Sequence, residues 1–157
     1  MLNVFMWLMR GGNMAWQAAQ PDWGVYLALI LITSPLQAAA EEFFFRGYLQ
    51  QAIGSLAGRA WVGIVFSALV FAFFHGNQNI ALFAHRLGFG LIAGTLVWAT
   101  GGLEAAIAVH VANNVFAFGY ALFMGGVAAL KATSEISWEV ACSDLASFAV
   151  FGALAWC

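Results

Sequence analysis

The chain has 157 residues, of which 64% are hydrophobic and 8% are charged, and its mean hydropathy is +0.88. Ordinary soluble domains carry about a quarter charged residues, so this composition excludes a soluble globular domain and indicates an integral membrane protein. The net charge of −2 provides no basic surface for phosphate groups, and we therefore expect no nucleic-acid partner. The two cysteines, Cys142 and Cys157, form no metal-ligand or CxxC pattern.

The N-terminal segment, residues 1–22, differs from the rest of the chain. Arg10 follows its apolar opening instead of preceding it, which is the reverse of the order in a signal peptide. We expect this segment to be an interfacial helix or the remnant of an earlier span. Residues 23–157 are then a single transmembrane domain, with the motif core at 35–118.

Apolar stretches separated by turn-forming residues fill that domain, at 23–53, 60–75, 79–99, 103–125 and 140–157. Only helices and closed barrels satisfy their backbone hydrogen bonds in lipid, so the fold class is predicted as all-α, a polytopic transmembrane helical bundle of about four to five spans. The first stretch is too long for one crossing, and we expect it to break or kink at Pro35. The turn after it is expected to begin at Gly54 and Ser55.

Charged side chains at the end of the first stretch point to a reaction site, because ionisable residues in a membrane are costly and mark functional positions. Glu42 and Arg46 are four residues apart, share a helix face and are expected to pair. Glu41 points about 100° away from Glu42 and is expected to lack an ion-pair partner. Such a carboxylate can act as a general base. The alternative is that both glutamates only lock a kinked helix to Arg46.

Polar groups on two later stretches are expected at a similar depth. His110 and Asn114 also lie four residues apart and project from one side of a helix, whereas Asn113 points elsewhere. His75 ends the second stretch. Counted at about 1.5 Å per residue from the span ends, Glu41, His75, His110 and Asn114 reach a similar central layer. The sequence therefore predicts one buried polar site assembled from three non-adjacent helices.

Other polar and small residues are expected in supporting positions. His85 and Arg86 are predicted to snorkel or hydrogen-bond near the opposite interface, with an accessory role at the site mouth as the alternative. Interfacial or loop positions are expected for Asp144, Lys131, Glu135 and Glu139. Close helix packing is expected at Gly88, Gly90 and Gly94.

The ordered motifs EExxxR at Glu41–Arg46, FxxxH at Phe71–His75 and HxxxN at His110–Asn114 resemble the CAAX-protease and bacteriocin-processing (CPBP) family of intramembrane proteases. The resemblance extends from about Pro35 to Phe118. It implies that Glu41 activates a water molecule with help from His75, and that His110 and Asn114 bind the oxyanion. Glu42 and Arg46 would hold Glu41 in place. Family members usually have further spans before the first motif, so we expect a short member or a fragment.

The resemblance implies an intramembrane endopeptidase that hydrolyses peptide bonds of a membrane-associated protein or peptide. The expected partners are that substrate, entering from the membrane, and the lipid bilayer; the expected location is the plasma (inner) membrane of a prokaryote. No cofactor is expected. The alternative is an intramembrane metalloprotease with zinc on Glu41, His75 and His110, although the HExxH spacing is missing.

Two further functions remain open from the sequence. One is a non-proteolytic bacteriocin-immunity or membrane scaffold protein of the same family, which would bind a peptide or partner in the same cavity. The other is a haem or quinone protein that uses His75 and His110 and needs no glutamate pair.

Overall fold

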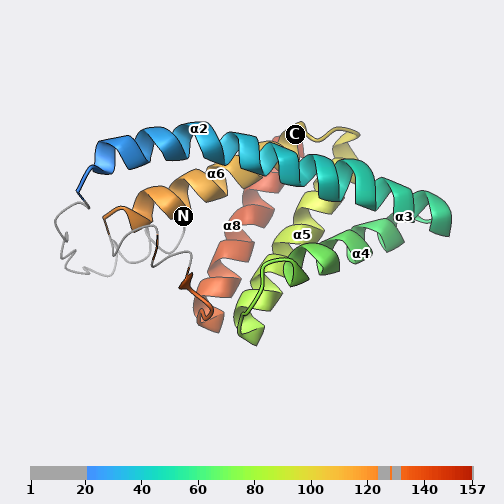
Figure 1. Ribbon diagram of the computed structural model, residues 1–157. Coiled ribbons are helices and arrows are strands. Elements are labelled where there is room, and N and C mark those ends of the chain that lie inside the picture. The colour runs from blue at the N-terminus through green and yellow to red at the C-terminus, as the bar shows by residue number, and fades with distance from the viewer. Residues whose placement is uncertain (1–20, 124–127, 129–131, 157) are drawn as a thin grey trace.

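The structure is a computed structural model, and it describes residues 21–123, 128 and 132–156. Every regular element among these residues is helical, which confirms the all-α prediction. In chain order the elements are α2 (Trp23–Glu42), the π-helix η1 (Phe43–Leu49), α3 (Gln50–Ala57), α4 (Ala60–Phe73), α5 (Ile80–Thr100), α6 (Glu104–Ala121) and α8 (Trp138–Trp156) (Figure 1). The expectations for residues 1–20 and for Lys131 lie outside the described residues.

The first three elements form one continuous helical rod of 35 residues, from Trp23 to Ala57. Pro35 lies inside α2, so the expected break there is wrong. Membrane helices tolerate an internal proline because neighbouring groups can satisfy the freed backbone carbonyl. The irregularity lies further along, in η1, where the Gln50 backbone N–H donates to the Phe45 carbonyl five residues back. Short π-helical segments are frequent at functional sites.

Glycines in the left-handed conformation end two of the helices. The rod continues through Gly54 and Ser55 and ends at Gly58, whose φ is 64°, so the expected turn begins later than predicted. Gly101, with φ of 74°, ends α5. A side chain at either position would strain this backbone. Each glycine therefore allows the chain to turn within a short loop.

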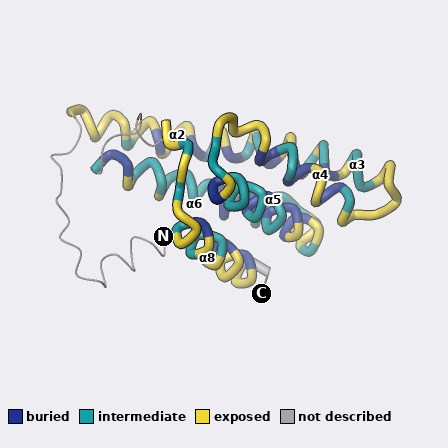
Figure 2. Tube along the Cα trace, turned by 90° about the horizontal axis from the view of Figure 1, so that it is seen from below, coloured by how far each residue is buried: buried dark blue, intermediate teal, exposed yellow. Residues whose placement is uncertain are grey.

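The helices pack along one another in pairs that are mostly consecutive in sequence. The two main exceptions are α2, which lies beside α6 (Figure 1), and α5, which packs against α8. The other main contacts join α3 to α4 and α4 to α5. Buried positions gather where helices face each other, and exposed positions form the outer surface (Figure 2). The α2–α6 contact is therefore the one that joins the first and third motifs.

Length and composition qualify two helices for crossing a membrane, Trp23–Ala57 and Ile80–Thr100. The helix Ala60–Phe73 is also apolar but shorter. Large apolar side chains are exposed along the rod, including Leu36, which is 68% exposed. Such a surface suits lipid and is costly in water.

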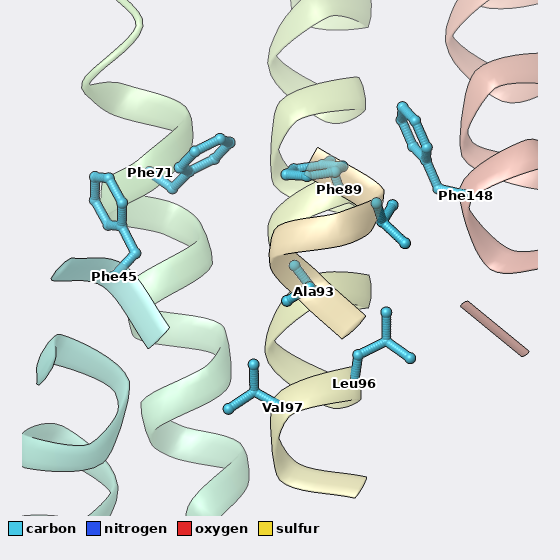
Figure 3. Packing of buried hydrophobic residues seen from close by; sticks show 9 residues of the cluster. Phe45, Phe71, Phe89, Ala93, Leu96, Val97 and Phe148 are labelled. Atoms are coloured by element: carbon cyan, nitrogen blue, oxygen red, sulfur yellow. The ribbon is translucent and has the colours of Figure 1, made fainter. Parts of the chain in front are cut away.

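Aromatic side chains form the centre of the bundle, and Figure 3 shows how they meet across helices. The ring of Phe45 lies edge-on to Phe71, with centroids 5.2 Å apart, and Phe89 lies edge-on to Phe148 at 5.1 Å. Edge-to-face pairs of this kind are favourable beyond the apolar area they bury. This cluster connects η1, α4, α5 and α8.

Small residues allow the helices to approach as closely as the sequence predicts. A Cβ atom at Gly88 would lie 2.6 Å from the Leu145 side chain of α8. One at Gly90 would lie 2.9 Å from the Ala68 side chain of α4. One at Gly94 would lie 2.7 Å from the Gln50 side chain. The prediction of close packing at these three glycines is confirmed.

Candidate active site

Glu42 lies at the centre of the polar cluster. It is the last residue of α2 and is fully buried. Its Oε1 atom accepts a hydrogen bond from Arg46 Nη1 at 2.9 Å and a second from His110 Nδ1 at 2.7 Å. The Glu42–Arg46 pair predicted from the four-residue spacing is therefore present. The contact with His110 spans 68 positions of sequence and depends on the packing of α6 against α2.

The Arg46 guanidinium is buried among aromatic rings. Its Cζ atom lies 4.7 Å from the centroid of Phe71, 5.8 Å from Phe45 and 5.9 Å from Phe89. Nη2 also donates to the Gly90 carbonyl at 3.4 Å. A desolvated cation is stabilised by ring faces and by its carboxylate partner. The Phe of the FxxxH motif therefore supports the Arg of the EExxxR motif.

Glu41 is more accessible than Glu42, with 27% of its side chain exposed. Its two oxygens face different groups. Oε1 accepts a hydrogen bond from Gln37 Nε2 at 2.9 Å, and Oε2 lies 3.7 Å from His110 Nε2. The expectation that Glu41 has no partner is therefore wrong, because the His110 ring reaches between two neighbouring carboxylates although they point in different directions.

The His110 ring is 4% exposed and has a carboxylate beside each nitrogen. A carboxylate can only accept from Nδ1, so the Glu42 contact places a proton on that atom. Nε2, which faces Glu41, then carries either a lone pair or a second proton. The edge of the ring also packs on Phe89, with centroids 4.9 Å apart. The ring is therefore held between the two carboxylates.

His75 follows the end of α4 and is exposed. Its Nδ1 atom is 2.7 Å from the Phe71 carbonyl, which can only accept, so Nδ1 carries the proton and Nε2 offers a lone pair. Glu41 and His110 lie close enough to interact with the ring electrostatically. The second stretch was expected to continue to residue 75, whereas α4 ends at Phe73 and places His75 on the turn.

Asn114 lies one turn after His110 on α6 and is half-buried. Its Oδ1 atom accepts a hydrogen bond from Asn113 Nδ2 at 3.3 Å. Asn113, which was expected to point elsewhere, therefore contacts Asn114. With its oxygen engaged in this way, Asn114 has N–H groups to offer to a negative charge.

Two other ionisable residues of α5 form separate contacts. His85 Nε2 lies 3.7 Å from Asp144 Oδ2, so Asp144 faces α5 from within α8. Asp144 is therefore not in a loop, and the expected interfacial position stays a prediction. Arg86 Nη1 donates to Gln78 Oε1 at 2.6 Å and to the His75 carbonyl at 3.4 Å. Arg86 thus holds the turn that carries His75. Glu135 and Glu139 are exposed near the start of α8.

A pocket of about 310 Å³ opens beside the turn between α4 and α5. Its walls are formed by Phe73, Gly76, Asn77, Gln78, Ile80 and Phe83. None of these residues belongs to the Glu42 cluster, so we place the reacting groups at the cluster and not in this pocket.

The side chains do not form a metal site of the usual kind. Within the part of the chain that the structure describes, no three His, Cys, Asp or Glu residues come together in a way that could hold a metal ion. Both histidines use Nδ1 as a donor, which leaves Nε2 as the nitrogen that a metal ion would bind. The alternative zinc site on Glu41, His75 and His110 therefore stays a prediction.

Gln37 is a polar neighbour that the sequence reasoning missed. It contacts Glu41 from one helical turn earlier. Gln37 is not ionisable and was not predicted as a site residue. Its four-residue spacing from Glu41 is nevertheless the same pattern that predicted the Glu42–Arg46 pair.

Comparisons with known proteins agree with the motif pattern. The family model described as type II CAAX prenyl endopeptidase Rce1-like matches residues 23–116, more than half of the chain. A Bacillus subtilis (strain 168) protein described as uncharacterized protein YyaK is 40% identical over 97 residues, which are 57% of this chain and 32% of that protein. The chain thus spans about a third of that relative's length. No solved structure matches.

Proposed function

The chain belongs to the Rce1-like family of type II CAAX prenyl endopeptidases, and we propose that it is an intramembrane endopeptidase whose base is Glu41. The observation that carries this proposal is the placement of His110 between two carboxylates, with Nδ1 held by Glu42 at 2.7 Å and Nε2 at 3.7 Å from Glu41. The more accessible carboxylate, Glu41, can reach a water molecule. The buried one, Glu42, holds the ring.

In the proposed reaction, Glu41 Oε2 takes a proton from a water molecule while the water oxygen forms a bond to the carbonyl carbon of the scissile peptide. His75 Nε2, which has a lone pair, accepts a hydrogen bond from the same water and orients it. The carbonyl oxygen becomes negatively charged. The proton held by Glu41 then passes to the leaving nitrogen as the C–N bond breaks, so that one water molecule is consumed and the carboxylate is restored.

The negative oxygen needs hydrogen-bond donors. Asn114 offers its amide N–H groups because Asn113 already contacts its oxygen. His110 offers an Nε2–H donor when that nitrogen carries a proton. Donors aimed at a developing oxyanion are among the strongest contributions to acyl-transfer catalysis.

Glu42 and Arg46 act as supports in this mechanism. Both are fully buried, so neither meets bulk water. Glu42 fixes the orientation and the tautomer of His110, and Arg46 balances the charge of Glu42. The proposed mechanism uses no metal ion.

The setting of His110 argues against the haem or quinone alternative. An axial haem ligand offers one nitrogen to iron with an open approach, whereas here carboxylates lie beside both nitrogens. The non-proteolytic immunity or scaffold reading makes a different prediction, because its biological effect would survive loss of Glu41. We propose a membrane-associated protein or peptide as substrate, and the plasma membrane of a prokaryote as the location, in line with the bacterial relative.

The test is cleavage of a peptide library by the detergent-purified protein. Glu41→Gln and His110→Ala should abolish cleavage while the helical content is retained. Glu135→Gln, the same chemical change at an exposed position outside the cluster, should leave cleavage unchanged. Full activity of Glu41→Gln would refute the mechanism, and loss of activity on addition of a zinc chelator would refute its metal-free form.

A further inference from the structure

We propose that Gln37 is a positioning residue that sets the orientation of the Glu41 carboxylate. This inference rests on the proposed function, because it concerns which oxygen of Glu41 faces the reacting groups. Gln37 lies outside the three motifs and makes its contact from the preceding turn of α2.

The two oxygens of the Glu41 carboxylate contact different residues. Gln37 Nε2 donates to Oε1 at 2.9 Å, and this leaves Oε2 directed towards His110 Nε2 at 3.7 Å. The terminal torsion of a glutamate is broad and allows the carboxylate plane to rotate. A charge-assisted hydrogen bond to one oxygen restricts that rotation. Gln37 therefore presents Oε2 as the atom that takes the proton.

The surroundings of Gln37 favour this role over an incidental surface contact. Gln37 is exposed on a helix whose neighbouring outward residues, such as Leu36 and Ile32, are apolar and at least 62% exposed. An amide in an apolar setting is unfavourable unless it is hydrogen-bonded. Its partner here is the more accessible carboxylate of the site. The Gln37–Glu41 contact therefore satisfies an amide that would otherwise be unpaired among apolar side chains.

Glu42 provides an internal contrast. Its Oε1 accepts from both Arg46 and His110, so its orientation is fixed by two buried donors. Glu41 is held by contacts at the edge of the cluster, and Gln37 supplies the shorter one. Removing Gln37 should therefore loosen Glu41 and leave Glu42 in place.

The variant Gln37→Met removes the donor and keeps the length and the helix preference of the side chain. With a peptide that the wild type cleaves, we expect kcat to fall roughly tenfold and KM to stay within about twofold, because one hydrogen bond to a charged group is lost and no substrate contact is. Gln37→Glu, which keeps the shape but replaces the donor with an acceptor, should lose at least as much. Thr33→Val removes a hydroxyl one turn earlier, where it bonds only its own helix, and should change nothing.

An infrared difference spectrum gives a readout that does not depend on activity. The carboxylate stretching band of Glu41 is identified by its disappearance in Glu41→Gln. It should shift in Gln37→Met and stay in place in Thr33→Val.

The two measurements separate the inference from the proposed function. Normal cleavage by Gln37→Met, or an unshifted Glu41 band, would overturn the role of Gln37 while the protease function stands. A folded wild type that cleaves nothing would overturn the protease function. In that case the band alone decides whether Gln37 orients Glu41.

Discussion

Two histidines of this protein face a carboxylate at the same distance, yet their surroundings differ. His110 Nε2 lies 3.7 Å from Glu41, and His85 Nε2 lies 3.7 Å from Asp144. The other nitrogen of His110 is bonded to buried Glu42, whereas neither nitrogen of His85 has a hydrogen-bond partner among the residues that the structure describes. A histidine becomes a defined proton carrier when its second nitrogen is fixed. The comparison teaches that the supporting groups, more than the pair itself, distinguish the candidate active site.

The largest expected difference between the two histidines is in catalysis. His110→Gln should lower kcat by about 100-fold or more, because a positioned acid–base or oxyanion group is lost. His85→Gln is the same chemical change on α5 and should leave kcat close to that of the wild type. Steady-state kinetics of both variants with one peptide substrate measure the difference. Equal losses would show that the whole polar interior, and not the Glu42-supported ring, determines activity.

The second-largest effect is expected on stability, where a buried and an exposed arginine should differ. Arg46→Met leaves the Glu42 carboxylate buried without its cation, and we expect the free energy of unfolding to fall by ~3–5 kcal/mol. Arg59→Met makes the same change at the exposed residue before α4 and should cost little. Denaturation followed by circular dichroism in detergent compares the two. If Arg46→Met is as stable as Arg59→Met, the buried charges are not what holds α2 against α6.

The smallest effect is expected at the contact between His85 and Asp144. Asp144 has a side chain that is 25% exposed, and its contact with His85 is longer than a hydrogen bond. Asp144→Asn should therefore change the free energy of unfolding by about 1 kcal/mol or less. The same denaturation measurement checks it. A loss comparable with that of Arg46→Met would mean that the His85–Asp144 contact anchors α8 as strongly as the motif cluster anchors α6.

The sequence alone identified the features that depend on neighbours along the chain. The composition predicted a helical membrane protein. Apolar stretches bounded by turn-forming residues located α4, α5 and α6 to within a few residues of their observed ends. The four-residue spacing of Glu42 and Arg46 predicted their pair because such residues share a helix face. The same rule could have revealed the Gln37–Glu41 contact. The sequence contains the information for this contact, because Gln37 and Glu41 are also four residues apart.

The tertiary structure alone decided the features that depend on how helices rotate and pack. Gln50 is buried together with Glu42 and Arg46, and its Nε2 donates to the Gly94 carbonyl of α5, a contact that depends on how η1 and α5 pack. Spacing within α6 could not reveal that His110 reaches both glutamates, since this requires α6 to lie beside α2. The aromatic rings around Arg46 come from η1, α4 and α5. Such contacts join residues far apart in sequence, and no local period encodes them.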